Sequence, residues 1–76
     1  MIHPSTGIEF NVANHTFVTL NVYDNLGREV AVLFNGYKDK GKYFATFDGS
    51  NFSSGIYYYK IVIGNYIQIK KMLLLK

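Results

Sequence analysis

Apolar and polar residues alternate along much of this chain, with a period of two residues. The alternation runs through residues 7–12 and again through residues 16–23, where Val18, Leu20 and Val22 share one face. This period places every second side chain on the same side of a β-strand. No segment sustains a helical spacing, so no helix longer than about two turns is expected.

Four further segments have the composition of strands and are separated by turn signals. They cover residues 28–34, 42–48, 56–63 and 66–75. Asn35-Gly36 predicts a chain reversal after the third strand, followed by a charged loop over residues 38–42. The third strand carries a continuous apolar run, which is typical of a central strand covered on both faces. Gly64-Asn65 predicts a two-residue hairpin turn between the last two strands.

The register of the fifth strand follows from one charge. Lys60 interrupts the face that also carries Tyr58, whereas the opposite face is uninterrupted. The uninterrupted face consists of Tyr57, Tyr59, Ile61 and Ile63. We therefore expect that second set to face the core, with Tyr58 and Lys60 outward.

The alternation of the last strand breaks at Lys70-Lys71, where both faces receive a charge. Either a β-bulge or a position at the edge of a sheet reconciles two consecutive lysines with a strand. The basic tail that contains them is either an electrostatic contact for a partner or a device that keeps an edge strand soluble. The sequence leaves these two readings open.

Together the strands predict an all-β domain spanning residues 1–76, an immunoglobulin-like antiparallel β-sandwich of six to seven strands. Composition agrees, because the chain has seven Tyr and six Phe in only 76 residues. It has no Cys, which excludes a disulfide, a thiolate metal site and a Cys nucleophile. The net charge of +3 is scattered, so nucleic-acid binding is not expected. The apolar runs are too short for insertion into a membrane.

No constellation of residues predicts catalysis, a cofactor or a metal site. Asp24 and Asp48 lie in turns, where the ordinary role of Asp is to cap its own backbone. They would bind Ca²⁺ only if their loops converged, and the density of acids is low for such a loop. His3 and His15 both lie in turn-like segments without further ligands at metal-binding spacing.

Four motifs follow one another along the chain, at residues 3–10, 18–30, 48–57 and 70–76. The second has the form V-x-L-x-V-Y-D-x-x-G-R-E-V and the third the form D-G-x-x-x-x-x-G-x-Y. In this order they resemble the C-terminal sorting domains of the bacterial type IX secretion system. His3 departs from the Asn that usually opens the first motif. The motif positions are Pro4, Tyr23, Asp24, Gly27, Arg28, Asp48, Gly49, Gly55 and Tyr57.

The resemblance implies a non-catalytic β-sandwich that ends a larger exported protein. Another part of that parent would carry the signal for entry into the periplasm of a Gram-negative bacterium. The type IX translocon would recognise the domain, and a sortase-like peptidase would commonly remove it, leaving the cargo secreted or at the cell surface. Recognition would be between proteins and would lie at the extreme C-terminus. The candidate recognition residues are Lys70, Lys71, Met72, Leu74 and Lys76.

Two other functions compete with this one. The immunoglobulin-like domain of flagellar hook-capping proteins carries similar motifs and serves in assembly. A carbohydrate-binding accessory domain is the third possibility, although the chain lacks Trp and an obvious aromatic platform.

Overall fold

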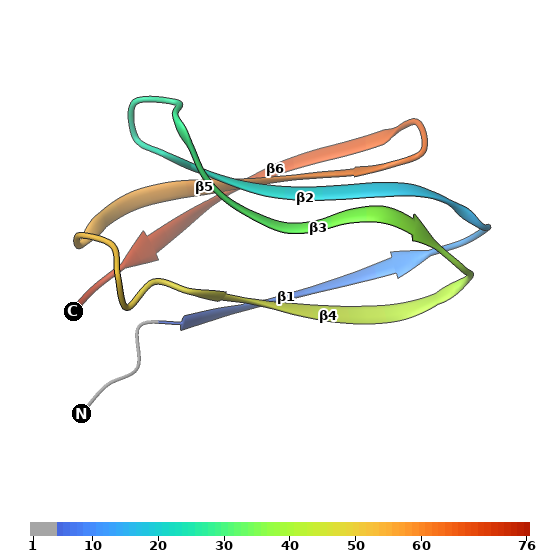
Figure 1. Cartoon of the computed structure of the whole chain (residues 1–76), viewed down its shortest axis with the longest axis horizontal. Helices are drawn as coiled ribbons and strands as arrows, with labels where there is room; N and C mark the ends of the chain where they lie inside the picture. Colours follow the sequence, from blue (N-terminus) through green and yellow to red (C-terminus); the bar gives the residue numbers. More distant parts are fainter. Residues whose placement is uncertain (1–4) are drawn as a thin grey trace.

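Six β-strands and no helix make up residues 5–76, the part of the chain that the computed structural model describes (Figure 1). The strands are β1 (Ser5–Val12), β2 (Thr16–Asp24), β3 (Glu29–Lys38), β4 (Gly41–Asp48), β5 (Gly55–Ile63) and β6 (Tyr66–Leu74). The prediction of an all-β fold is confirmed, at the lower end of its strand count. Over these residues no helix of the length and apolar character needed to cross a membrane occurs. His3 and Pro4 lie outside the described residues.

The strands form two antiparallel sheets that face each other. The larger sheet has the order β3-β2-β5-β6, and the smaller sheet pairs β1 with β4. Figure 1 shows β1 and β4 lying together along one side of the larger sheet. The chain therefore crosses between the sheets after β1, after β3 and after β4, as in a sandwich.

The core lies between the sheets and is built from the alternating positions that the sequence predicts. Val18, Leu20 and Val22 of β2 are completely buried. Opposite them, β1 contributes Ile8, Phe10 and Val12. Burying one side chain of this size contributes about 1.5–3 kcal/mol to folding, so the period-two pattern directly stabilises the sandwich.

The β5 register agrees with the expectation from Lys60. Tyr57 and Ile61 are 7% and 2% exposed, whereas Tyr58 and Lys60 lie on the outer face of the sheet. Tyr59 is half-buried against the core. The hairpin turn at residues 64–65 is also confirmed.

Two expectations for β3 were wrong. The strand does not reverse at Asn35-Gly36 but continues to Lys38, and the reversal falls between Lys38 and Gly41. Gly36 lies within the strand, and a Cβ there would make an ordinary van der Waals contact with the Phe34 ring at 3.4 Å.

Strand β3 is also an edge strand, not a central one. Its pairing with β2 shifts register twice, between Leu20 and Asn21 and between Val22 and Tyr23. Irregularities of this kind turn consecutive side chains toward the same face. This explains how an apolar run without alternation packs several residues against the core, namely Val30, Ala31, Leu33 and Phe34.

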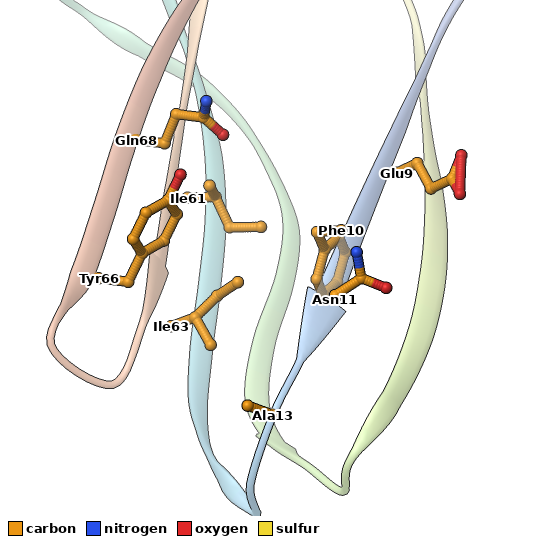
Figure 2. A pocket seen from close by; sticks show the side chains of 8 residues that line it. All are labelled: Glu9, Phe10, Asn11, Ala13, Ile61, Ile63, Tyr66 and Gln68. Carbon is orange, nitrogen blue, oxygen red and sulfur yellow. The ribbon is translucent and has the colours of Figure 1, made fainter.

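The two open sides of the sandwich differ. On the β3–β4 side, the Lys38 ammonium lies over the rings of Phe34 and Tyr43, at 4.1 and 4.2 Å from their centroids. On the other side, a hollow of about 460 Å³ separates β1 from β5 and β6 (Figure 2). Phe10, Ile61 and Tyr66 are among its lining residues. The hollow is present because two strands cannot cover the full width of four.

Candidate recognition surface

Strand β6 forms one edge of the larger sheet and pairs only with β5 among the described residues. Its register against β5 is continuous, so the consecutive lysines are explained by an edge position and not by a bulge. Lys70 and Lys71 are both exposed and point to opposite faces of the sheet. Met72 and Leu74 are 7% and 4% exposed and belong to the core, so their side chains are not available to a partner in this fold.

The outer face of β6 is apolar and open to solvent. Ile67, Ile69 and Leu73 are each more than half exposed, at 58%, 62% and 62%. The cross-strand register sets Lys71 opposite Tyr58 and Ile69 opposite Lys60. The strand therefore presents a row of aliphatic side chains interrupted by one lysine, with a second lysine on the neighbouring strand.

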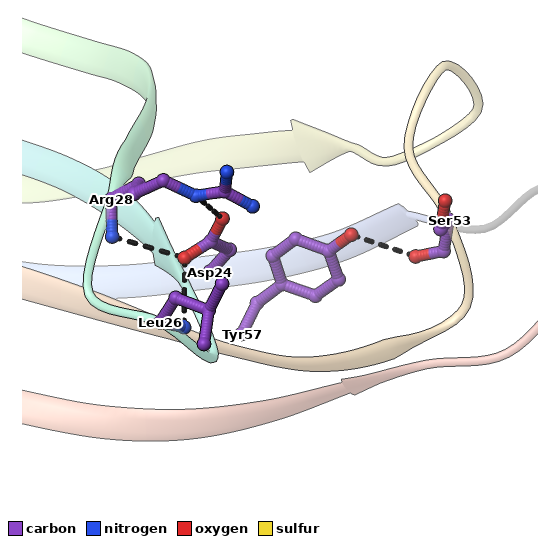
Figure 3. Close-up of polar contacts among 5 residues, drawn as sticks. All are labelled: Asp24, Leu26, Arg28, Ser53 and Tyr57. Carbon is purple, nitrogen blue, oxygen red and sulfur yellow. Dashed lines mark hydrogen bonds and ion pairs between the residues drawn. The ribbon is translucent and has the colours of Figure 1, made fainter.

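The last residue is held by the loop that joins β4 to β5. The Lys76 backbone N–H donates to the Ser54 hydroxyl oxygen at 3.1 Å, and the Lys76 ammonium donates to the Ser50 carbonyl at 2.6 Å. From the same loop, the Ser53 carbonyl accepts a hydrogen bond of 2.7 Å from the Tyr57 hydroxyl (Figure 3). The loop and the end of the chain therefore form one structural unit.

The second motif folds into the turn between β2 and β3, where Asp24 caps the backbone as expected. Its Oδ1 accepts hydrogen bonds from the N–H groups of Leu26 and Arg28 at 2.9 and 3.0 Å, and its Oδ2 accepts one from Arg28 Nε at 2.7 Å (Figure 3). The Arg28 N–H donor and the guanidinium beside it lower the pKa of the Asp24 carboxyl below 3.8, although desolvation opposes them. Gly27 has a φ of 82°, which only glycine adopts readily. This turn is structural.

The third motif behaves in the same way. Asp48 Oδ1 accepts a hydrogen bond of 3.0 Å from the Ser50 N–H, which fixes the start of the loop. Gly49 is buried in the loop, and its carbonyl accepts from the Phe52 N–H at 2.9 Å. The Phe52 ring packs on Phe47 and Tyr57, with centroids 5.5 and 6.1 Å away. Motif residues from Asp48 to Tyr57 thus shape the loop that receives Lys76.

No cluster of three or more potential metal ligands exists within residues 5–76. His15 lies instead against Asp39, with 2.6 Å between Nδ1 and Oδ1, and stacks on Tyr37. Glu9 forms an ion pair of 3.2 Å with Lys42. These contacts join the turns and strands of the sandwich.

Sequence reasoning did not find the contact between Lys76 and the loop over residues 50–54. The Ser and Gly content of this segment indicates a loop, but the loop and the chain end are far apart in the sequence. Only the pairing of β5 with β6, which sets Gly55 opposite Leu74, brings them together. The two-residue hairpin turn that the sequence predicts at Gly64-Asn65 already implies this register, and following it to the ends of both strands would have placed Lys76 beside the loop.

The family comparison decides between the competing functions. A family model described as a secretion system C-terminal sorting domain matches residues 3–75, nearly the whole chain. The chain belongs to this family. No curated protein and no solved structure matches it. As a sorting domain of the type IX system it is a signal module and not a member of an enzyme family, and a protein that carries it is exported to the cell surface or secreted.

Proposed function

We propose that this sorting domain directs a cargo protein across the outer membrane by presenting its C-terminal strand to the type IX translocon. The strand carries Lys70 and Lys71 at a free sheet edge, and the chain end carries Lys76. The domain performs no chemistry itself, and a sortase-like peptidase at the cell surface removes it after translocation. The observation that carries this proposal is the family match together with the exposed, charged edge of β6.

Two features of the fold support recognition at this end of the molecule. The main chain of β6 has hydrogen-bonding groups on its outer side that no described strand satisfies. A partner that adds a strand there gains affinity from main-chain hydrogen bonds and register from the charged side chains. Met72 and Leu74 take part indirectly, because their burial holds the strand in place.

The test is a surface-delivery assay. The domain is fused to a secreted reporter in a host with the type IX system, and Lys71 and Lys76 are changed to Gln. Lys71 is an exposed charge without an ion pair in the described part of the chain, and Lys76 loses one exposed hydrogen bond to the Ser50 carbonyl, so the melting temperature should fall only slightly. The expected result is a loss of the reporter from the cell surface and its accumulation in the periplasm.

Lys40→Gln is the matched control, because Lys40 is an exposed lysine in the turn before β4 and lies away from β6. This variant should be delivered as well as the parent. Normal delivery of the folded Lys71→Gln/Lys76→Gln variant would refute the lysines as the signal.

A further inference from the structure

The acidic side chains of this domain have hydrogen-bond or ion-pair partners, whereas several of its lysine side chains have none among the described residues. Every acidic side chain of the described residues has a partner: Glu9 contacts Lys42, Asp24 contacts Arg28, Glu29 contacts Asn21, Asp39 contacts His15 and Asp48 contacts the Ser50 N–H. In contrast, the side chains of Lys60, Lys70 and Lys71 take part in none of the side-chain ion pairs or hydrogen bonds of residues 5–76, and the same holds for Lys40 in the turn before β4. The β5–β6 hairpin contains no acidic residue, so its three lysines form a concentration of positive charge.

Two of these lysines are close neighbours. Lys60 lies opposite Ile69, two positions from Lys71, so Lys60 and Lys71 are diagonal neighbours on the outer face. Cβ atoms in such a diagonal pair lie about 7–8 Å apart or slightly less. Like charges at this distance repel each other, and a carboxylate placed beside them would offset the repulsion with two attractions.

Lys70 would also attract a carboxylate, on the inner face of the sheet. It lies opposite Tyr59, at the level of the sheet where Lys71 lies opposite Tyr58. Adjacent residues of a strand point to opposite faces, so a strand added to β6 would bring two of its own consecutive residues to Lys70 and Lys71. On the outer face, Ile69 and Leu73 flank Lys71 with exposed aliphatic surface.

We infer that the free edge of β6 binds an extended segment of a partner protein with two consecutive acidic residues flanked by apolar ones. One carboxylate meets Lys71 and Lys60 on the outer face, and the next meets Lys70 on the inner face. The flanking apolar residues cover Ile69 and Leu73. This inference rests on the proposed function, and it specifies the chemistry of the segment that recognises the sorting domain.

The other edges are less suited to such a ligand. The β3 edge has its Lys38 ammonium held over two aromatic rings, and the β1–β4 sheet pairs its Glu9 with Lys42. A second copy of this chain is also disfavoured at β6, because pairing two such edges would bring Lys70 and Lys71 toward their own equivalents.

The test is a titration of the isotope-labelled domain with a short synthetic peptide, Thr-Val-Val-Asp-Glu-Val-Val-Thr, followed by amide chemical shifts. The matched probe carries Asn-Gln in place of Asp-Glu. The acidic peptide should bind roughly tenfold more tightly than the amide peptide, with the largest shifts in β6. Its affinity should fall as salt rises from about 0.1 M to 1 M, because salt screens exposed charges.

Substitutions locate the site. Lys70→Gln and Lys71→Gln should each weaken the acidic peptide roughly threefold and leave the amide peptide unchanged, whereas Lys40→Gln should change neither. Equal affinity for the two peptides, largest shifts in β1 or β3, or self-association through β6 would each overturn the inference.

The two proposals fail in different experiments. If the lysines are required for surface delivery but acidic and amide peptides bind alike, the sorting role stands and the acidic partner is wrong. If the acidic peptide binds at β6 but delivery does not require Lys71 and Lys76, the edge binds acids and the proposed signal is wrong.

Discussion

At the scale of single residues, the hydrogen bonding of the turn between β2 and β3 is concentrated in Asp24. One carboxylate satisfies two backbone N–H groups and the Arg28 guanidinium, and it does so beside a glycine with positive φ. Side chains that accept several hydrogen bonds in their charged form hold their pKa below the ordinary value. The turn between β2 and β3 should therefore be sensitive to acid.

We expect Asp24→Asn to lower the free energy of unfolding at neutral pH. The pKa of Asp24 is lower in the folded protein than its ordinary value of 3.8. The stability that the ionised group supplies is thus fully present above that value and is lost as the pH falls through the folded pKa. Urea unfolding of the parent and the variant should show a gap that is constant near neutrality and narrows below pH 3.8. A gap that stays constant through the acid range would show that the carboxylate charge does not matter.

At the scale of strands, β6 combines a free edge with a largely apolar outer face. Lys71 is the charged residue between Ile69 and Leu73 on that face. Lysines on edge strands prevent edge-to-edge pairing between molecules. We therefore expect Lys71 to have a solubility role that is independent of any recognition role.

We expect Lys71→Ile to leave the fold intact but to promote aggregation. The change would extend a row of exposed aliphatic side chains along an unpaired edge, which is the pattern of an aggregation-prone strand. Light scattering during a heating ramp should rise earlier and at lower protein concentration than in the parent. Lys40→Ile adds the same side chain in a turn and should have a much smaller effect, and equal scattering by both variants would contradict the role of the edge.

The strands themselves and the β5–β6 hairpin could be predicted from the sequence, but the other strand neighbours could not. The alternation in β1 and β2 and the single charge at Lys60 gave the correct faces, because period-two burial is a local property. The edge position of β3 was missed, because its continuous apolar run arises from register shifts against β2 that depend on the partner strand. The burial of Met72 and Leu74 was likewise missed, since it depends on which face of β6 meets the smaller sheet.

At the scale of the molecule, two strands face four, and the strands differ in how much of the structure covers them. β2 and β5 each have a neighbour on both sides, whereas β1, β3, β4 and β6 each have a neighbour on one side. Four of the core residues with almost no exposure, Leu20, Ile61, Val18 and Val22, lie on these two central strands. The centre of the larger sheet should therefore open last.

We expect native-state hydrogen exchange to be slowest for amides in β2 and β5. Protection follows the free energy of the smallest opening that exposes each amide, and an edge strand opens without disturbing the sheet centre. Amides of β6 and of β1 beside the hollow should exchange faster. Slowest exchange in β1 and β4 would mean that the smaller sheet is the more stable unit.

The pairing of β1 with β4 has a consequence for the order of folding. Ser5 pairs with Asp48 and Val12 pairs with Gly41. Strand β1 can therefore pair only after the whole β2–β3 hairpin and β4 have followed it in the sequence. The β2–β3 and β5–β6 hairpins need only short loops, whereas closing β1 on β4 and β2 on β5 requires long ones. Non-local pairing of this kind slows folding to the range of milliseconds to seconds. Export of the protein that carries this domain therefore has to accommodate a sandwich that folds slowly compared with a domain built from local contacts.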